Sequence, residues 1–265
     1  MFSDVTHPKR AHDRAGHAQR NYWRDLFRHR ELFYFLGWRE VLARLQADAD
    51  RDFRLMMTLL GKLFERHPAL RECEPQLRSS FDILVTAFAS GNKLLICGNG
   101  GSAADCEHIV GELLKGFLKP RPLPAEQKQR LAASAGELGQ SIAAKLQGAL
   151  PAISLVSQSA IMTAIVNDTA GDMIFAQQVY GLGQPGDVLL AITTSGNSAN
   201  VINAVAVAKA FGLKTIGLTG RSGGALAQMA DAAVRVPADS TAEIQELHLP
   251  VYHWLASETE ERFFG

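Results

Sequence analysis

Five short apolar runs, separated by stretches with helical periodicity, constrain the fold of this chain more than any other feature. Each run is almost continuously apolar, which is what strands covered on both faces of a parallel sheet require. The alternation predicts an α/β fold of three layers, a doubly wound five-stranded parallel sheet between helices. The predicted strands are Lys93–Cys97, Ala152–Val156, Asp187–Thr193, Lys214–Leu218 and Ala233–Val236.

Helices are expected between these strands and on either side of them. Two amphipathic helices are predicted within residues 50–90, because leucine and phenylalanine recur there at helical spacing. Ser240 and Glu243 fit a capping box at the start of a last helix that runs to about Phe264, and Pro250 inside it predicts a kink or a late start. The helices between strands are expected at about 103–117, 158–166, 172–180, 198–211 and 222–229.

The chain divides by composition into an extension and one domain. Residues 1–49 are expected to form a partly helical N-terminal extension, whose aromatic cluster packs on its own core or on a second subunit. An aromatic platform for nucleic acid is less favoured, because no strand pattern presents the rings. Residues 50–265 are expected to form the domain, with an insertion at about 119–147, either a solvated excursion or a lid.

The bulk composition narrows the function classes. Formal net charge is zero, so nothing steers the molecule toward nucleic acid or an anionic membrane. No apolar run approaches the roughly 18–20 residues that span a bilayer. Cys73, Cys97 and Cys106 are odd in number and lack metal-ligand spacing. We therefore expect a cytoplasmic protein without nucleic-acid or membrane partners.

A glycine-rich turn follows the first predicted strand. Gly98-x-Gly100-x-x-Ala103 formally matches a dinucleotide fingerprint, but the acidic residue expected about 20 positions later is missing. We therefore expect no nucleotide cofactor. A glycine turn at a helix N-terminus still favours a phosphate, and the simpler alternative is a tight turn with Ser102 as an N-cap.

A second loop, Thr193-Thr194-Ser195-Gly196-Asn197-Ser198, carries four hydroxyls between a strand end and a helix start. Hydroxyls and backbone N–H groups at a helix N-terminus make a neutral phosphate cup, although turn and capping chemistry alone would explain one such loop. Two loops at the carboxyl ends of parallel strands point to one crevice.

Histidines and a carboxylate form a third group of candidate site residues. His108 and Glu112 lie four residues apart, on one helix face, where a surface contact is the commonest explanation. The last helix offers Gln245, His248 and His253. Two histidines, a carboxylate and an amide oxygen could hold a zinc-like ion or serve in acid–base catalysis, and the sequence leaves both open.

These three motifs together resemble the sugar isomerase (SIS) domain family, and more narrowly the phosphoheptose isomerases, over roughly residues 50–265. The resemblance implies an aldose–ketose isomerase that converts sedoheptulose 7-phosphate to D-glycero-D-manno-heptose 7-phosphate through an enediol. It also implies a homotetramer with sites at subunit interfaces and one zinc ion per site.

The same resemblance assigns roles to individual residues. Glu112 and His253 would be the catalytic base and acid. The metal ligands would be His108, Glu112, Gln245 and His253. Substrate contacts would come from Asn99, Gly100, Gly101, Ser102, Asp168, Thr193, Thr194, Ser195, Ser198 and Gln245, of which the hydroxyl residues hold the phosphate and Asn99 and Asp168 touch sugar hydroxyls.

One departure and two alternatives accompany this resemblance. The family often has an arginine four residues after the glutamate, where this chain has Gly116 beside Lys115. One alternative is a non-catalytic SIS protein, such as a regulator that binds the replication initiator, but Glu112 and its three partner ligands favour an enzyme. The other is an isomerase of a different phosphosugar.

Overall fold

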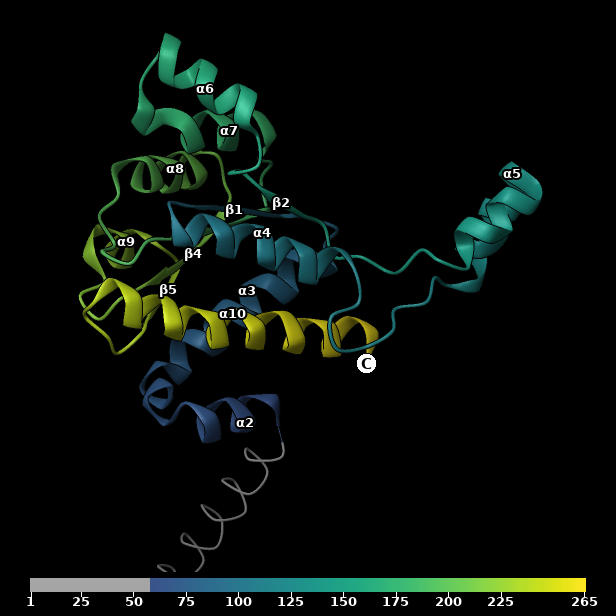
Figure 1. Ribbon diagram of the computed structural model, residues 1–265, viewed down its shortest axis with the longest axis horizontal. Helices are drawn as coiled ribbons and strands as arrows, with labels where there is room; N and C mark the ends of the chain where they lie inside the picture. The colour runs from purple at the N-terminus through teal and green to yellow at the C-terminus, as the bar shows by residue number, and fades with distance from the viewer. Residues whose placement is uncertain (1–57) are drawn as a thin grey trace, which may run out of the picture. The chain divides into compact units, whose positions relative to one another are not determined.

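The computed structural model describes residues 58–265, and the expected extension at 1–49 with its boundary lies outside them. The described part is built on one five-stranded sheet (Figure 1). All neighbouring strands are parallel, in the order β2-β1-β3-β4-β5. The strands are β1 (Leu94–Gly98), β2 (Ala152–Ser154), β3 (Val188–Ile192), β4 (Lys214–Thr219) and β5 (Ala232–Arg235).

Helices cover both faces of this sheet. Helices α3, α4 and α10 pack on one face, and α7, α8 and α9 on the other, with α6 against α7. The predicted doubly wound α/β fold is therefore confirmed. The helices are α2 (Leu59–Arg66), α3 (Glu74–Ala89), α4 (Gly101–Leu114), α5 (Ala125–Ala143), α6 (Ser159–Asp168), α7 (Ile174–Leu182), α8 (Ala199–Ala210), α9 (Gly224–Met229) and α10 (Thr241–Phe264), with short 3₁₀ turns at Pro68–Cys73 and Gly171–Met173.

The central strands are buried along their whole length. Every residue of β1 and β3 is inaccessible to solvent or nearly so, which explains why their sequences are continuous apolar runs instead of alternating ones. Side chains of these strands pack against α7 and α8 in one core. This core fixes the strand ends from which the candidate site loops leave.

Helix α10 begins where the capping box predicts. The Ser240 hydroxyl accepts from the Glu243 backbone N–H and also bonds its carboxylate. The helix then runs unbroken from Thr241 to Phe264 with Pro250 inside it, so a late start is wrong. Packing of α10 on α2, α3 and α4 compensates for the backbone hydrogen bond that proline cannot make.

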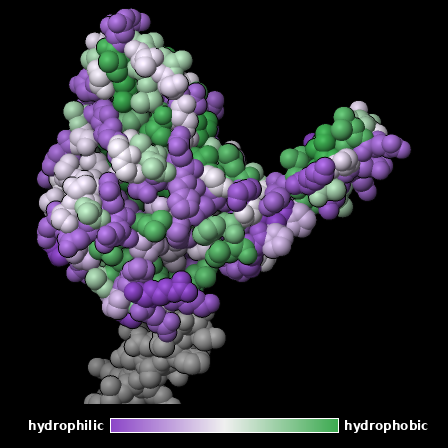
Figure 2. All heavy atoms as spheres, in the orientation of Figure 1, coloured by the Kyte–Doolittle hydropathy of each residue, from purple (hydrophilic) through white to green (hydrophobic). Residues whose placement is uncertain are grey.

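The stretch 119–147 contains α5, which projects from the other helices (Figure 1) and packs extensively on no other described element. Figure 2 shows apolar residues along this projecting helix, among them Leu138 and Ile142, both exposed. The two ends of this stretch lie close together, because Pro122 and Gln147 form an antiparallel bridge. In this structure the stretch is an excursion from the helices that cover the sheet. Within residues 58–265 no helix is both long and apolar enough to cross a membrane.

Candidate active site

Two loops meet where the strand order of the sheet reverses. Strands β1 and β3 are neighbours, with Gly98 opposite Ile192, and their connections leave in opposite directions around the sheet. In open α/β sheets this switch point is where ligands bind. Asn99 and Asn200 join the two loops through reciprocal amide hydrogen bonds of 2.9 and 2.8 Å. The glycine turn and the start of α8, which the hydroxyl loop leads into, therefore lie side by side at one edge of the sheet.

The glycine turn needs its glycines for two different reasons. Gly100 has φ +57° and ψ −120°, a conformation that side chains disfavour. Gly101 opens α4, and a Cβ there would collide with the Gln245 carboxamide from α10. Ser102 is buried inside the first helical turn, and the N-cap position belongs to Gly100, so Ser102 as an N-cap is wrong.

The hydroxyl loop presents its side chains at the start of α8. Thr193 Oγ1 and Ser198 Oγ lie 2.8 Å apart, and the Ser195 hydroxyl accepts from the Asn197 N–H at 3.2 Å. Thr194 is half-buried, and its carbonyl receives the Gly220 N–H. Several hydroxyls thus gather beside a helix N-terminus, an arrangement that suits an anion without any lysine.

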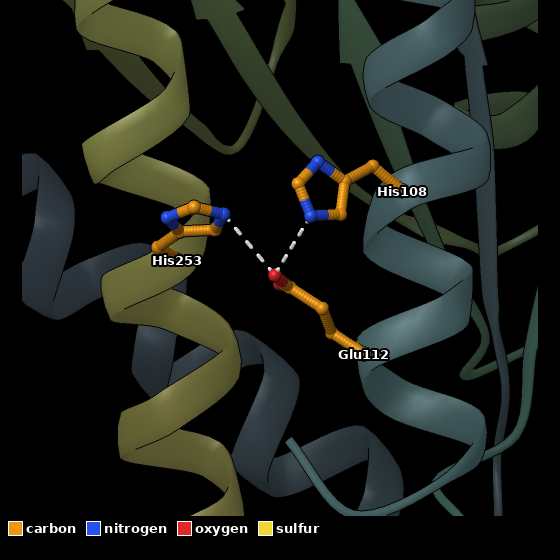
Figure 3. Close-up of side chains that lie close together, drawn as sticks. All are labelled: His108, Glu112 and His253. Carbon is orange, nitrogen blue, oxygen red and sulfur yellow. Dashed lines mark ion pairs between the residues drawn. The ribbon is translucent and has the colours of Figure 1, made fainter. Parts of the chain in front are cut away.

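Further along α4, the sequence-predicted catalytic residues meet side chains of α10 (Figure 3). His108 Nε2 and His253 Nε2 each lie 3.1 Å from Glu112 Oε1. Glu112 is 4% exposed, whereas both histidines are partly open to solvent. A surface pair of His108 and Glu112, the commonest explanation for their spacing, is therefore wrong, because the carboxylate is buried between two imidazoles.

Burial sets the proton affinities of this cluster. Loss of hydration raises the pKa of Glu112 to about 7, with Lys115 opposing the shift and Glu260 adding to it. Burial also lowers the pKa of His253, and the nearby His108 lowers it further. A carboxyl that titrates near neutrality is matched to proton transfer at physiological pH.

The cluster fits a divalent metal ion on its own geometry. Each of His108, Glu112 and His253 offers one ligand atom, and these atoms lie within 4.8 Å of one another. Both Glu112 oxygens and His253 Nε2 are buried without a hydrogen-bond partner, so polar atoms converge there uncompensated. Ligands about 2.0–2.1 Å from a tetrahedral zinc are roughly 3.3 Å apart, close to the 3.1 Å seen here.

The described contacts of two predicted residues are with residues outside this cluster. The Gln245 carboxamide packs against Gly101, seven residues before His108 and therefore roughly 10 Å earlier along the axis of α4. Asp168 is exposed at the end of α6, where its carboxylate accepts from the Asn167 amide. Helix α6 lies at the far side of the sheet from α10 (Figure 1).

Comparison with known proteins identifies the family. A family model described as SIS domain matches residues 129–220. The phosphoheptose isomerase of Thiobacillus denitrificans is 43% identical over 194 residues, which are 72% of this chain and 85% of that protein. That of Geotalea daltonii is 38% identical over 195 residues, 74% of this chain and 88% of that protein. This chain belongs to the phosphoheptose isomerase family.

Solved structures of phosphoheptose isomerases share its fold. The enzyme from Neisseria gonorrhoeae superposes with a TM-score of 0.58 at 31% identity, covering 83% of this chain and 99% of that one. The enzyme from Francisella tularensis gives a TM-score of 0.58 at 33% identity, covering 77% of this chain and 100% of that one. The resemblance to the phosphoheptose isomerases, inferred from the three sequence motifs, is therefore confirmed.

Three residues around the cluster were not predicted from the sequence. The Tyr252 hydroxyl lies 3.1 Å from Asp105 Oδ1 and 3.1 Å from His108 Nδ1. Burial and the neighbouring Asp105 raise the pKa of Tyr252, so its hydroxyl keeps its proton. The Phe117 ring packs at 5.6 Å from that of His253. The i, i+3 spacing of Asp105 and His108 was a usable signal, but their shared partner lies on another helix.

The departure at Gly116 also has a structural consequence. The Gly116 N–H donates to the Gln147 carboxamide at 2.7 Å. A Cβ at this position would collide with the Lys119 carbonyl and with Gln147. The turn in this family member is therefore built around glycine and leaves no room for an arginine without rearrangement.

Proposed function

We propose that this chain is an aldose–ketose isomerase that converts sedoheptulose 7-phosphate to D-glycero-D-manno-heptose 7-phosphate. The observation that carries the proposal is the buried Glu112 between His108 and His253, on the helix that starts at the glycine turn beside the start of α8. Family membership supports it, because a relative 43% identical over 194 residues is a phosphoheptose isomerase.

The glycine turn and the hydroxyl loop would together bind the phosphate end of the substrate. The amides of Gly100 and Gly101 at the start of α4 would add backbone donors to the side-chain hydroxyls. Ser102 and Glu112 are ten residues apart, roughly 15 Å along the helix axis, so the substrate must be long enough to reach from one to the other. A seven-carbon chain suits this span better than a triose. The hydroxyls are those of Ser102, Thr193, Thr194, Ser195 and Ser198.

Proton transfers by two residues suffice for the reaction. Glu112 removes a proton from C1, beside the C2 carbonyl, while His253 donates a proton to the carbonyl oxygen. The resulting cis-enediol collapses when His253 takes the proton from the C1 hydroxyl and Glu112 returns its proton to C2. The electron pair of the C1–H bond becomes the double bond of the enediol and then forms the new C2–H bond. The O–H pair of the C1 hydroxyl forms the new carbonyl, so the reaction needs no redox cofactor.

Zinc is the metal we propose for the cluster, held by His108, Glu112, His253 and, after a change of its side-chain position, Gln245. When bound, such an ion supplies positive charge that stabilises the developing enediolate. The support is the set of unpartnered nitrogen and oxygen atoms that converge there.

The remaining parts of the proposal concern assembly and location. Asn99 and Asp168 are the proposed contacts to sugar hydroxyls, and Asp168 is exposed and remote from the cluster of its own chain. A homotetramer with sites between subunits would allow such a residue to serve a neighbouring site. Residues 50–265 are the proposed SIS domain, and a cytoplasmic location stays a prediction.

The test is turnover of sedoheptulose 7-phosphate by the purified protein, with and without added zinc. Wild type should form an aldoheptose phosphate, and Glu112→Gln should lose about 10²–10⁴ in kcat. Glu107→Gln, an exposed carboxylate on the same helix, is the matched control and should keep full activity. If wild type shows no turnover, the isomerase function is rejected and a binding protein remains. If Glu112→Gln turns over substrate as fast as wild type, Glu112 is not the base.

A further inference from the structure

A short polar chain behind the catalytic cluster links α4 to α10. Tyr252 is 1% exposed, and its hydroxyl donates to Asp105 Oδ1 at 3.1 Å. The Tyr252 hydroxyl oxygen also lies 3.1 Å from His108 Nδ1. The His108 and Tyr252 rings meet edge to face, with 5.4 Å between their centroids. The opposite ring nitrogen of His108, Nε2, faces Glu112 at 3.1 Å.

The donor and acceptor inventory of this chain fixes where the protons lie. A tyrosine hydroxyl has a single proton to donate, and an ionised carboxylate can only accept. The Tyr252 proton is therefore committed to Asp105, and the contact to His108 Nδ1 is a hydrogen bond only if that nitrogen is the donor. A neutral imidazole carries one proton, so His108 Nε2 then presents a lone pair toward Glu112.

We propose that Tyr252, oriented by Asp105, is a positioning residue that holds His108 in the Nδ1–H tautomer. The inference rests on the proposed function, because the held lone pair is what a metal ion or a transferred proton in the cluster requires. The other tautomer would place the imidazole proton between Nε2 and Glu112, and Nε2 would then have no lone pair for a metal ion or a transferred proton. Hydrogen bonds of this kind orient histidine ligands and set their basicity in metal sites.

The first test reads the tautomer directly by ¹⁵N NMR of histidine-labelled, metal-free protein at a pH of about 8, where an ordinary imidazole is neutral. The His108 signals are identified from their absence in His108→Ala. Wild type should show the Nδ1–H form. Tyr252→Phe, which removes only the hydroxyl, should shift His108 toward the Nε2–H form. Tyr180→Phe, an exposed ring on α7, is the matched control and should leave His108 unchanged.

Asp105 provides a second, independent arm. In Asp105→Ala the Tyr252 proton has no carboxylate acceptor and turns to His108 Nδ1, so the Nε2–H form should again increase. Asp105→Asn keeps a carbonyl acceptor and should retain the wild-type tautomer. Titration with zinc should show Tyr252→Phe binding about 10–100-fold more weakly than wild type, and Asp105→Asn within a few-fold of it.

The outcomes separate this inference from the function. An unchanged His108 tautomer in folded Tyr252→Phe and Asp105→Ala overturns the positioning role, whatever the protein turns over. Because the NMR measurement needs neither substrate nor metal, a wild type that fails to isomerise sedoheptulose 7-phosphate rejects the proposed function and leaves the tautomer result standing.

Discussion

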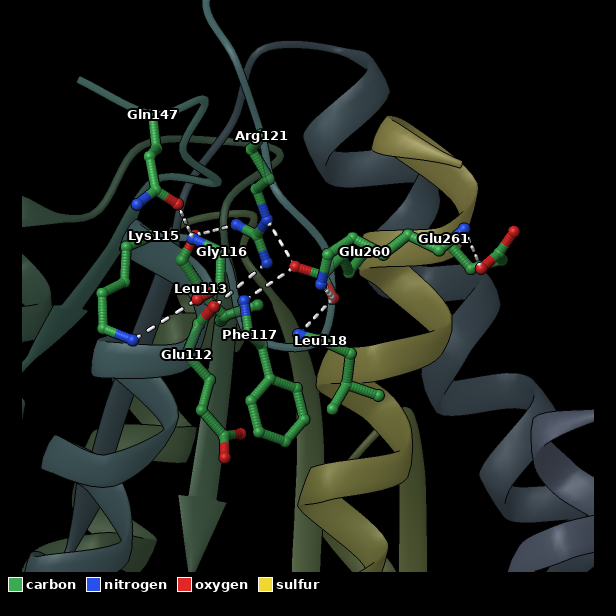
Figure 4. A network of polar contacts seen from close by, with 11 residues as sticks. Glu112, Leu113, Lys115, Gly116, Phe117, Leu118, Arg121, Gln147, Glu260 and Glu261 are labelled. Carbon is green, nitrogen blue, oxygen red and sulfur yellow. Dashed lines mark hydrogen bonds and ion pairs between the residues drawn. The ribbon is translucent and has the colours of Figure 1, made fainter. Parts of the chain in front are cut away.

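Arg121 and Glu260, 139 positions apart in the sequence, form a buried ion pair with 2.7 Å between Arg121 Nε and Glu260 Oε1 (Figure 4). The rest of the guanidinium donates to the backbone carbonyls of Leu113 and Glu112 at 2.7 and 3.1 Å. Arg121 therefore donates hydrogen bonds to carbonyls that the end of α4 leaves without a helical partner. One of these carbonyls belongs to Glu112, the proposed base.

The carboxylate of Glu260 holds the following turn. Its oxygens accept from the backbone N–H groups of Phe117, Leu118 and Lys119 at 2.7–3.1 Å. Phe117 in turn packs on the His253 ring. The ion pair thus connects the end of α4, which supplies Glu112, to α10, which supplies His253.

Removing one partner of this pair should be costly. Arg121→Met leaves the buried Glu260 carboxylate without its counter-ion, and we expect a loss of about 3–5 kcal/mol in the free energy of unfolding. Urea unfolding of the variant and wild type measures it. Arg130→Met is the control, because Arg130 and Glu126 form an exposed pair on α5 worth about 0–1 kcal/mol. Similar losses in the two variants would contradict the role of burial.

The same carboxylate predicts how stability depends on pH. Burial alone would raise the pKa of Glu260, but the N–H groups of Phe117 and Leu118 together with Arg121 bring it below its ordinary value of 4.5. The stability it contributes is therefore fully present above a pH of about 4.5, the pKa of the unfolded chain, and is lost as the pH falls through the folded pKa.

We expect Glu260→Gln to reduce this acid-dependent loss. Below about pH 4.5 the free energy of unfolding of wild type should fall more steeply than that of the variant, as measured by urea unfolding at a series of pH values. Glu126→Gln, an exposed glutamate on α5, should follow the wild-type curve. Parallel curves for wild type and Glu260→Gln would show that Glu260 is not the group responsible.

The metal cluster predicts a stoichiometry. Wild type dialysed against zinc should retain one ion per chain, and His108→Ala and His253→Ala should each lose most of it, because each removes one of three converging ligand atoms. Elemental analysis of the dialysed proteins provides the measurement. His67→Ala, at the end of α2, should bind as wild type does. Full retention of zinc in both cluster variants would show that the cluster is not the zinc site.

Much of the fold was predictable because its signals are local. Strands such as Val188–Ile192 are continuous apolar runs, and Ser240 marks the start of α10 within one turn. The meeting of the two loops was predictable too, since parallel strands bring the loops after β1 and β3 to one edge of the sheet.

Other features could not be predicted, because they depend on the angle and offset between α4 and α10. The i, i+4 spacing of His108 and Glu112 is local, but the burial of Glu112 follows from the packing of His253 against it. Nothing in the sequence pairs Tyr252 with Asp105, 147 residues away. The contact between the Gln245 carboxamide and Gly101 likewise depends on the register of the two helices.

Helix α5 should contribute little to the stability of the domain. Leu138 is 65% exposed, so Leu138→Ala should change the free energy of unfolding by less than about 0.5 kcal/mol. The matched control is Leu113→Ala on α4, where the side chain is buried and the loss should be about 2–5 kcal/mol.

Replacing residues 124–145 with a short glycine–serine linker should likewise leave the domain folded. The flanking segments are already joined, since Gly148 donates to the Arg121 carbonyl and Gln147 accepts from Gly116, so a shorter loop costs little entropy. Thermal unfolding and size-exclusion chromatography of the deletion variant check this. A Leu138→Ala loss as large as that of Leu113→Ala, or a smaller assembly after the deletion, would show instead that a neighbouring subunit covers α5.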